Sequence, residues 1–241
     1  WTLGYHPTRR AESLPLIPKK RYEVMDRYLQ KRGRHGTQMM RGTASTQVSV
    51  DYFSEQDFVR KYRVACLIAP LLALLTDNAP IYEAQPNRSA CVRTTIWNDV
   101  DPDRCGIPPM LMDADFGFEA YADYVLQKPL VVSRRGHRTE GVGRKSAFEV
   151  YPSALQREEI EQILSMFFFD VRLKNYIEIR VADSMPAGYI AGYAEVIKAI
   201  FSSPAAQESI LRHYAGATVG SIEAAKLGVC CHGYQAQIYG H

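Results

Sequence analysis

Two stretches of the chain alternate between apolar and polar side chains. The first runs from Ala44 to Tyr52 and the second from Asn175 to Asp183. Because successive side chains of a strand point to opposite faces, each stretch predicts a β-strand with one apolar and one polar face. The apolar faces carry Thr46, Val48, Val50 and Tyr52 in the first stretch, and Ile177, Ile179 and Val181 in the second.

Apolar residues at helical spacing predict helices in the rest of the chain. Ser54 precedes the longest of them, which is expected to run to about Thr76, with Asp57 completing a capping box and Pro70 available to kink it. The other expected helices are 21–31, 116–127, 154–167 and the chain from Ala187 onward, with breaks near 203–204 and 216–221.

Shorter patterns predict further strands. Residues 91–97 and 130–133 look like strands, and 135–143 look like the turn of a hairpin or flap. Strands and helices are interspersed without a regular βαβ rhythm. The sequence therefore predicts an α+β fold with a mostly antiparallel sheet.

Composition narrows the classes of partner. The 29 basic and 26 acidic residues nearly balance, which argues against a nucleic-acid-binding module and leaves it a distant third alternative. The longest apolar run, 64–75, is too short to span a membrane and reads as a buried helix. The five cysteines show no C-x-x-C spacing, so we expect a reducing, cytoplasmic location rather than a disulfide scaffold or a zinc site.

The polar faces of the two long strands hold the first candidate site residues. Glu178 and Arg180 are two residues apart, so both project from the same face, where they form either a surface ion pair or part of a site. Gln47 and Ser49 form a similar row on the other strand, which is either solvent-facing or a set of ligands.

A third candidate is the segment from Arg93 to Arg104. It brings two arginines, Trp97 and three aspartates within twelve residues. Arginine suits bidentate binding of a carboxylate, and a tryptophan can wall a small pocket. The alternative is a loop held by salt bridges. The chain contains no P-loop, no G-x-G-x-x-G motif and no nucleophile signature.

Together these stretches resemble the plant and proteobacterial branch of the glutamate–cysteine ligase family. The resemblance rests on an ordered set of short motifs spanning about Gly4 to Asp183. They are Gly4-Tyr5-His6-Pro7, Arg21-Tyr22-x-x-Met25-x-x-Tyr28, Met39-Met40-Arg41-Gly42-Thr43, Thr46-Gln47-Val48-Ser49-Val50-Asp51, Ser54-Glu55-x-Asp57-x-Val59-Arg60-Lys61-Tyr62-Arg63, Ile96-Trp97-x-Asp99-x-Asp101-Pro102-Asp103-Arg104, Phe116-Gly117-Phe118-Glu119-x-Tyr121-x-Asp123-Tyr124 and Glu178-Ile179-Arg180-x-Ala182-Asp183.

The resemblance implies a glutamine-synthetase-like, curved antiparallel sheet with flanking helices that binds ATP with Mg²⁺. In such enzymes ATP phosphorylates the γ-carboxylate of glutamate, and the amine of cysteine attacks the acyl phosphate. The charge that accumulates on the transferring phosphoryl group requires cations beside it, and the divalent metal requires carboxylate and amide oxygens. The implied partners are small molecules: glutamate, cysteine and ATP.

The resemblance also implies roles for individual residues. Glu178 matches a metal-binding glutamate, and Arg180 matches the arginine that contacts the transferred phosphate. Gln47 matches a polar position at the metal and substrate site. Arg93 and Trp97 match the region that receives glutamate. Three further positions have two interpretations each: Arg104 binds substrate or holds a loop, and Met40 and Tyr121 line the substrate pocket or simply pack.

Departures from the family pattern keep alternatives open. Ser49 stands where an asparagine is usual, and Val181 where a glycine is usual, which suggests a divergent member. We expect residues 1–241 to form a single catalytic domain that lacks N-terminal strands with further metal-binding glutamates, so that these residues alone show little ligase turnover. The alternatives are a related ligase with another amine acceptor and a catalytically silent fragment.

Overall fold

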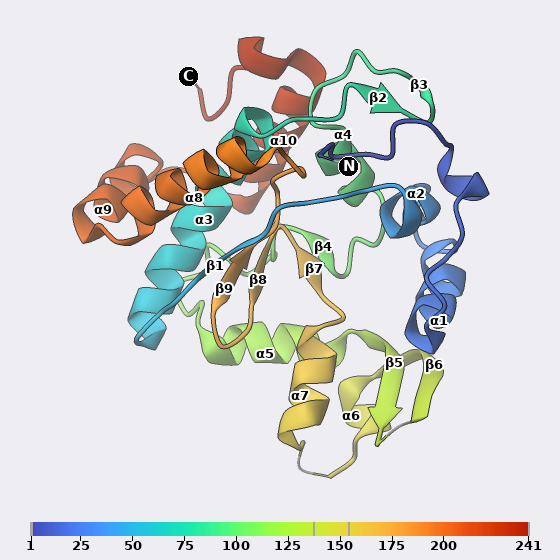
Figure 1. The fold of residues 1–241 in the computed structure, drawn as a ribbon. Helices are drawn as coiled ribbons and strands as arrows, with labels where there is room; N and C mark the ends of the chain where they lie inside the picture. Colours follow the sequence, from blue (N-terminus) through green and yellow to red (C-terminus); the bar gives the residue numbers. More distant parts are fainter. Residues whose placement is uncertain (1, 137, 154, 241) are drawn as a thin grey trace.

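A three-stranded antiparallel sheet lies near the middle of the chain's fold, with helices around it (Figure 1). The computed structural model describes residues 2–136, 138–153 and 155–240. The α+β prediction is confirmed, because helices and small, mostly antiparallel sheets alternate along the chain. Residue 137, inside the predicted hairpin turn, and residue 154, at the start of a predicted helix, lie outside the described residues.

The two alternating stretches pair with each other in this sheet. Strand β1 (Val48–Val50) pairs with β9 (Ile177–Ile179), and β9 pairs with β8 (Val171–Leu173). The register sets Ser49 and Arg172 on either side of Glu178. Both strand predictions are therefore confirmed at their centres, although the hydrogen-bonded strands are shorter than the alternating patterns.

The long helix α3 (Glu55–Leu75) packs beside this sheet and supplies much of the core. It begins where predicted, because the Ser54 hydroxyl accepts a hydrogen bond from the Asp57 N–H at 3.1 Å. Most of the apolar run from Val64 is buried within this helix, whereas Leu71 and Leu75 are exposed. No helix in the described part of the chain is long and apolar enough to cross a bilayer.

Residues 91–97 do not form the predicted strand. They form helix α4 (Val92–Trp97), which begins after Cys91. The run of β-branched side chains, Val92, Thr94, Thr95 and Ile96, has the composition of a strand, and this propensity is overridden by the packing of the helix in the core. In a helix, residues four apart share a face, so Arg93 and Trp97 now lie together.

The C-terminal third is helical, as predicted. Helices α8 (Ala187–Phe201) and α9 (Pro204–His213) break at Ser203, and α10 (Val219–His232) follows a second break. Figure 1 shows α8 and α9 on one side of α3, and α10 packs against α3 and α4.

The remaining elements surround this centre. Strands β5 and β6 form the expected hairpin, which packs on α1 and α6, although residues 138–143 were predicted as part of its turn and instead belong to β6. The elements are η1 (Ala11–Ser13), α1 (Lys20–Leu29), α2 (Gly36–Arg41), β2 (Ile81–Tyr82), β3 (Gln85–Pro86), β4 (Cys105–Gly106), α5 (Phe118–Gln127), β5 (Pro129–Arg135), β6 (Arg138–Ser146), α6 (Ala147–Val150), α7 (Arg157–Leu164), β7 (Phe168–Phe169) and η2 (Gly233–Gln235).

Candidate functional site

Glu178 lies on one face of the three-stranded sheet, in the middle of a group of cations. Its Oε2 atom lies 2.6 Å from both Arg172 and Arg180, and its Oε1 atom lies 3.2 Å from Lys174. Burial raises the pKa of Glu178, but the three cations outweigh burial and hold that pKa below its usual value. The carboxylate is therefore ionised at neutral pH, and three positive charges surround one negative charge.

Gln47 joins this group from the position just before strand β1. Its Oε1 atom accepts a hydrogen bond from Arg180 at 3.3 Å, although the residue itself is exposed. The two polar strand faces, more than a hundred residues apart in the sequence, thus meet at Arg180. Ser49 is exposed on the same strand, opposite Glu178.

Helix α4 brings two more of the predicted residues to Arg180. The guanidinium groups of Arg93 and Arg180 lie 5.3 and 5.7 Å from the ring centre of Trp97. Arg93 is only 6% exposed, and burial, followed by the charge of Arg180, lowers its pKa to about 10. Its side chain remains charged at neutral pH in a place where charge is costly.

Two buried donors in this group have no hydrogen-bond partner in the described structure: Arg93 Nε and Trp97 Nε1. Unpaired buried donors are rare, and each one left unpaired costs about 1–3 kcal/mol. Both groups donate and neither can accept, so the ligand that would satisfy them is an acceptor. Beside Arg180, the best match is a carboxylate or a phosphate.

The space at this point is small. A cavity of about 10 Å³ is lined by Arg93, Trp97, Asp170, Arg180 and their neighbours. This is about the space that one water molecule needs. A larger ligand therefore requires the side chain of Trp97 or Arg180 to move.

The metal-binding role predicted for Glu178 and Gln47 does not fit this arrangement. Both oxygens of Glu178 are engaged by cations, and Mg²⁺ would compete with them for the same carboxylate. Among the described residues, no group of three or more His, Cys, Asp or Glu side chains could hold a metal ion. The role stays a prediction, and the local charges favour an anion instead.

Arg104 is fully buried, and its hydrogen-bond partners differ from those of the group around Arg180. Its Nε atom donates to Asp101 at 2.6 Å, and its other nitrogens donate to the Tyr28 hydroxyl and the carbonyls of Pro129 and Met166. With these contacts no face of the guanidinium is open to substrate. The arrangement favours the second interpretation, a salt bridge that holds the loop.

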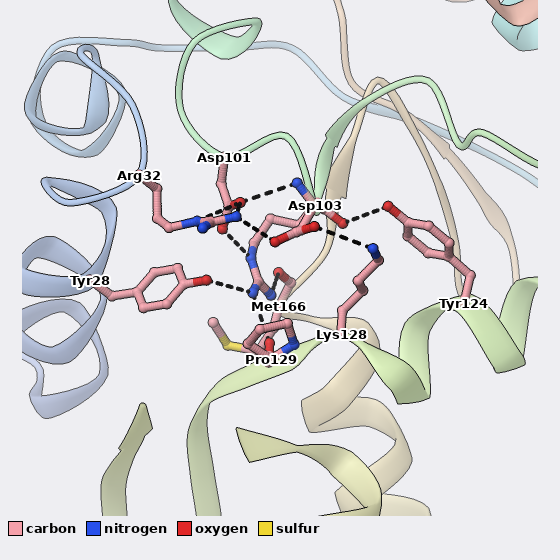
Figure 2. Close-up of polar contacts among 9 residues, drawn as sticks. Tyr28, Arg32, Asp101, Asp103, Tyr124, Lys128, Pro129 and Met166 are labelled. Carbon is pink, nitrogen blue, oxygen red and sulfur yellow. Dashed lines mark hydrogen bonds and ion pairs between the residues drawn. The ribbon is translucent and has the colours of Figure 1, made fainter. Parts of the chain in front are cut away.

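Other charged residues extend the network around Arg104 in Figure 2. Arg32 contacts Asp101 at 3.2 Å and also pairs with Asp103, while Lys128 lies 3.3 Å from Asp103. The acidic residues that follow Trp97 in the sequence thus anchor the loop to residues just beyond the ends of α1 and α5. They contribute to the candidate site only by placing α4.

Tyr121 and Met40 also take positions that favour packing. The Tyr121 side chain is 1% exposed, and its hydroxyl accepts from the Leu173 N–H at 3.4 Å, on the outer edge of strand β8. Met40 is half-buried and packs against the core. Their predicted place in the substrate pocket remains a prediction.

The sequence reasoning missed Arg172 and Lys174. Both come from β8 or its end and contact Glu178, and together they make the group strongly cationic. A signal was present, because Val171 and Leu173 alternate with Arg172 and Lys174. The stretch is too short for that alternation to stand out before its pairing with β9 is known.

Comparisons with known proteins agree on one family. The family model described as "Glutamate-cysteine ligase family 2(GCS2)" matches residues 1–224. Proteins named glutamate–cysteine ligase, chloroplastic, from Brassica juncea and Arabidopsis thaliana are each 36% identical over 192 residues, which is 76% of this chain and 37% of theirs. Glutamate–cysteine ligase B, chloroplastic, from Oryza sativa subsp. japonica is 34% identical and is covered to 39%. The chain thus spans less than half the length of these relatives.

The same relatives correct the expected location. All three are named as chloroplastic proteins, so the cytoplasmic location expected from the cysteines is wrong. The physical reason is simple: cysteine spacing indicates whether disulfides or metal sites are expected, and carries no targeting information.

Proposed function

This chain belongs to glutamate–cysteine ligase family 2, and from that premise we propose that it forms part of an ATP-dependent ligase that joins glutamate to cysteine through a γ-glutamyl phosphate. The observation that carries the proposal is the pair of unpartnered buried donors, Arg93 Nε and Trp97 Nε1, beside the Arg180 guanidinium. We take residues 1–241 as one catalytic domain in this proposal.

Each residue has one task. Arg93 and Trp97 bind a carboxylate of glutamate, which supplies the acceptor oxygens that these donors lack. Arg180 lies against the phosphoryl group that passes from ATP to the γ-carboxylate, where a fixed cation stabilises the charge that develops. Glu178 and Gln47 hold the Arg180 guanidinium in position through hydrogen bonds of 2.6 and 3.3 Å.

We propose that the whole protein binds ATP and Mg²⁺. The described residues of this chain supply the cationic side of the site, and no step assigned to them runs through the metal. For the fold, we propose that β1, β9 and β8 are part of a larger, curved sheet of the glutamine-synthetase type. For the location, the names of the relatives support a plastid.

The test uses the full-length protein that contains this chain. ADP release should require both glutamate and cysteine, and a panel of other amines separates this ligase from one with a different acceptor. Arg180→Gln should lower kcat about 100-fold or more, because it removes a cation that acts on the transition state. Arg93→Gln should instead raise the KM for glutamate.

The matched control is Arg88→Gln, which changes an exposed arginine five residues from Arg93 and should leave both constants unchanged. If Arg180→Gln keeps normal turnover, the proposed role of this site fails. If ADP release does not depend on cysteine with any variant, the proposed reaction fails, and a silent or differently specific member of the family remains.

A further inference from the structure

Cys91 and Cys230 meet although they are 139 residues apart in the sequence. Cys91 precedes the first turn of α4, and Cys230 lies near the end of α10. The Cys230 thiol donates to the Cys91 carbonyl oxygen at 3.7 Å. Neither cysteine takes part in the proposed ligase chemistry.

The two thiols have unequal access to solvent. Cys91 is only 3% exposed, whereas Cys230 is partly exposed. A soluble reagent can therefore reach Cys230 first, because Cys91 is buried. This is the arrangement of an attacking thiol and a resolving thiol.

The surroundings of Cys230 favour its thiolate. The hydrogen bond from Cys91, then one from Thr95 and the charge of Lys226, lower the pKa of Cys230 to about 7, against the opposing effects of burial and of Asp77. The same hydrogen bond and burial raise the pKa of Cys91. Burial raises the pKa of the two fully buried thiols, Cys66 and Cys105, which lie in the core and are out of reach.

We propose that Cys230 and Cys91 form a reactive thiol pair, in which Cys230 is modified by low-molecular-weight disulfides and Cys91 then closes an internal disulfide. The Cys230 thiolate attacks one sulfur of the small disulfide, forms a mixed disulfide and releases one thiolate. Cys91 loses its proton to solvent and attacks the Cys230 sulfur, which releases the second thiolate. Two protein thiols are oxidised, and one small disulfide is reduced to two thiols.

The bond would tie α10 to the start of α4, the helix that carries Arg93 and Trp97. Cys91 already lies in the left-handed backbone region, with φ at 52°, which residues other than glycine rarely adopt. A disulfide would thus add a covalent constraint at Cys91, whose left-handed backbone is already held in place by its surroundings. This inference stands independently of the proposed ligase function.

The test treats the reduced chain with 4,4′-dithiodipyridine and identifies the modified cysteines by peptide mapping. Wild type should yield a linked Cys91–Cys230 peptide. Cys91→Ser should keep the probe on Cys230 as a mixed disulfide, and Cys230→Ser should leave Cys91 reduced. Cys231→Ser, which changes the exposed neighbour, is the matched control and should behave as wild type.

The pH dependence supplies a second readout within the wild-type protein. The rate at Cys230 should rise about five-fold between pH 6 and 7 and level off above pH 8, as expected for a thiolate that forms near pH 7. A faster reaction at Cys231 than at Cys230, or a Cys230–Cys231 bond in place of the expected one, would overturn the proposal. This comparison needs no variant, so a substitution that prevents folding leaves the test intact.

Discussion

The charge balance on this face of the sheet depends on the carboxylate of Glu178. Its side chain is 8% exposed, and it is the shared partner of Arg172, Lys174 and Arg180. Removing one member of a buried ion pair costs more than the pair contributes, because the other charge is left in a poorly solvated place. Here one substitution would leave three cations facing each other.

Glu178→Gln is therefore expected to lower the free energy of unfolding by about 3 kcal/mol. The measurement is urea denaturation followed by circular dichroism. The control is Glu161→Gln, which breaks an exposed pair with Arg157 and should cost less than about 0.5 kcal/mol. Equal losses in the two variants would show that the cations do not depend on Glu178.

The same group gives the stability a pH dependence. Because the folded-state pKa of Glu178 is lowered, its contribution is fully present above about pH 4.3, the usual value for glutamate, and is lost as pH falls through the lower folded-state pKa. The difference in unfolding free energy between wild type and Glu178→Gln should accordingly be constant from pH 7 to 5 and shrink below pH 4. A difference that grows in acid would contradict this sign.

At the scale of single residues, the sequence identified Glu178, Arg180, Arg93 and Trp97, which the structure brings together around Arg180. It could not identify the three-cation arrangement, because the pairing of β8 with β9 brings Arg172 opposite Glu178. It also could not decide the role of Arg104. That role depends on the carbonyls of Pro129 and Met166, which come from distant parts of the chain.

Helices and strands were predictable from the sequence where the spacing of apolar residues agrees with the residues that cap or end an element. Helix α3 has both signals, a long apolar pattern and a Ser54 cap, and it forms within one residue of the predicted bounds. Helix α4 has neither. Its six residues are mostly β-branched, and only the surrounding core makes them helical. Local propensity is weak enough for tertiary packing to reverse it.

The cap of α3 can be tested at the element scale. Ser54→Ala removes the acceptor for the Asp57 N–H and should lower the free energy of unfolding by about 1 kcal/mol. Ser89→Ala, at an exposed serine outside any helix, is the control and should change it by less than about 0.5 kcal/mol. A loss as small as that of the control would mean that water replaces the cap.

The attachment of α10 to the rest of the molecule depends on a buried charge. Lys226 is 1% exposed, and its Nζ atom lies 2.8 Å from Asp170 and 3.1 Å from Glu223. Burial lowers the pKa of Lys226, but the two carboxylates outweigh burial and raise it. Asp170 also lines the cavity beside Arg93 and Arg180. The ion pair between Lys226 and Asp170 therefore connects α10 to the candidate site.

Lys226→Met should cost about 3 kcal/mol, because it leaves Asp170 buried without its cation. Adding Asp170→Asn should recover part of this loss, so a double-mutant cycle should show a coupling energy of about 1 kcal/mol or more. Lys198→Met, at a lysine that is 71% exposed, is the control. Additive losses would mean that the two side chains do not depend on each other.

The two outer edges of the central sheet differ. Along β8, the Tyr62 hydroxyl donates to the Val171 carbonyl, and the Tyr121 hydroxyl accepts from the Leu173 N–H. Strand β1 lies at the opposite edge, where within the described residues no further strand pairs with it. A free strand edge is a template for another backbone. Tyrosine hydroxyls thus occupy the outer backbone groups of β8, so a further strand of the proposed larger sheet has to join at β1.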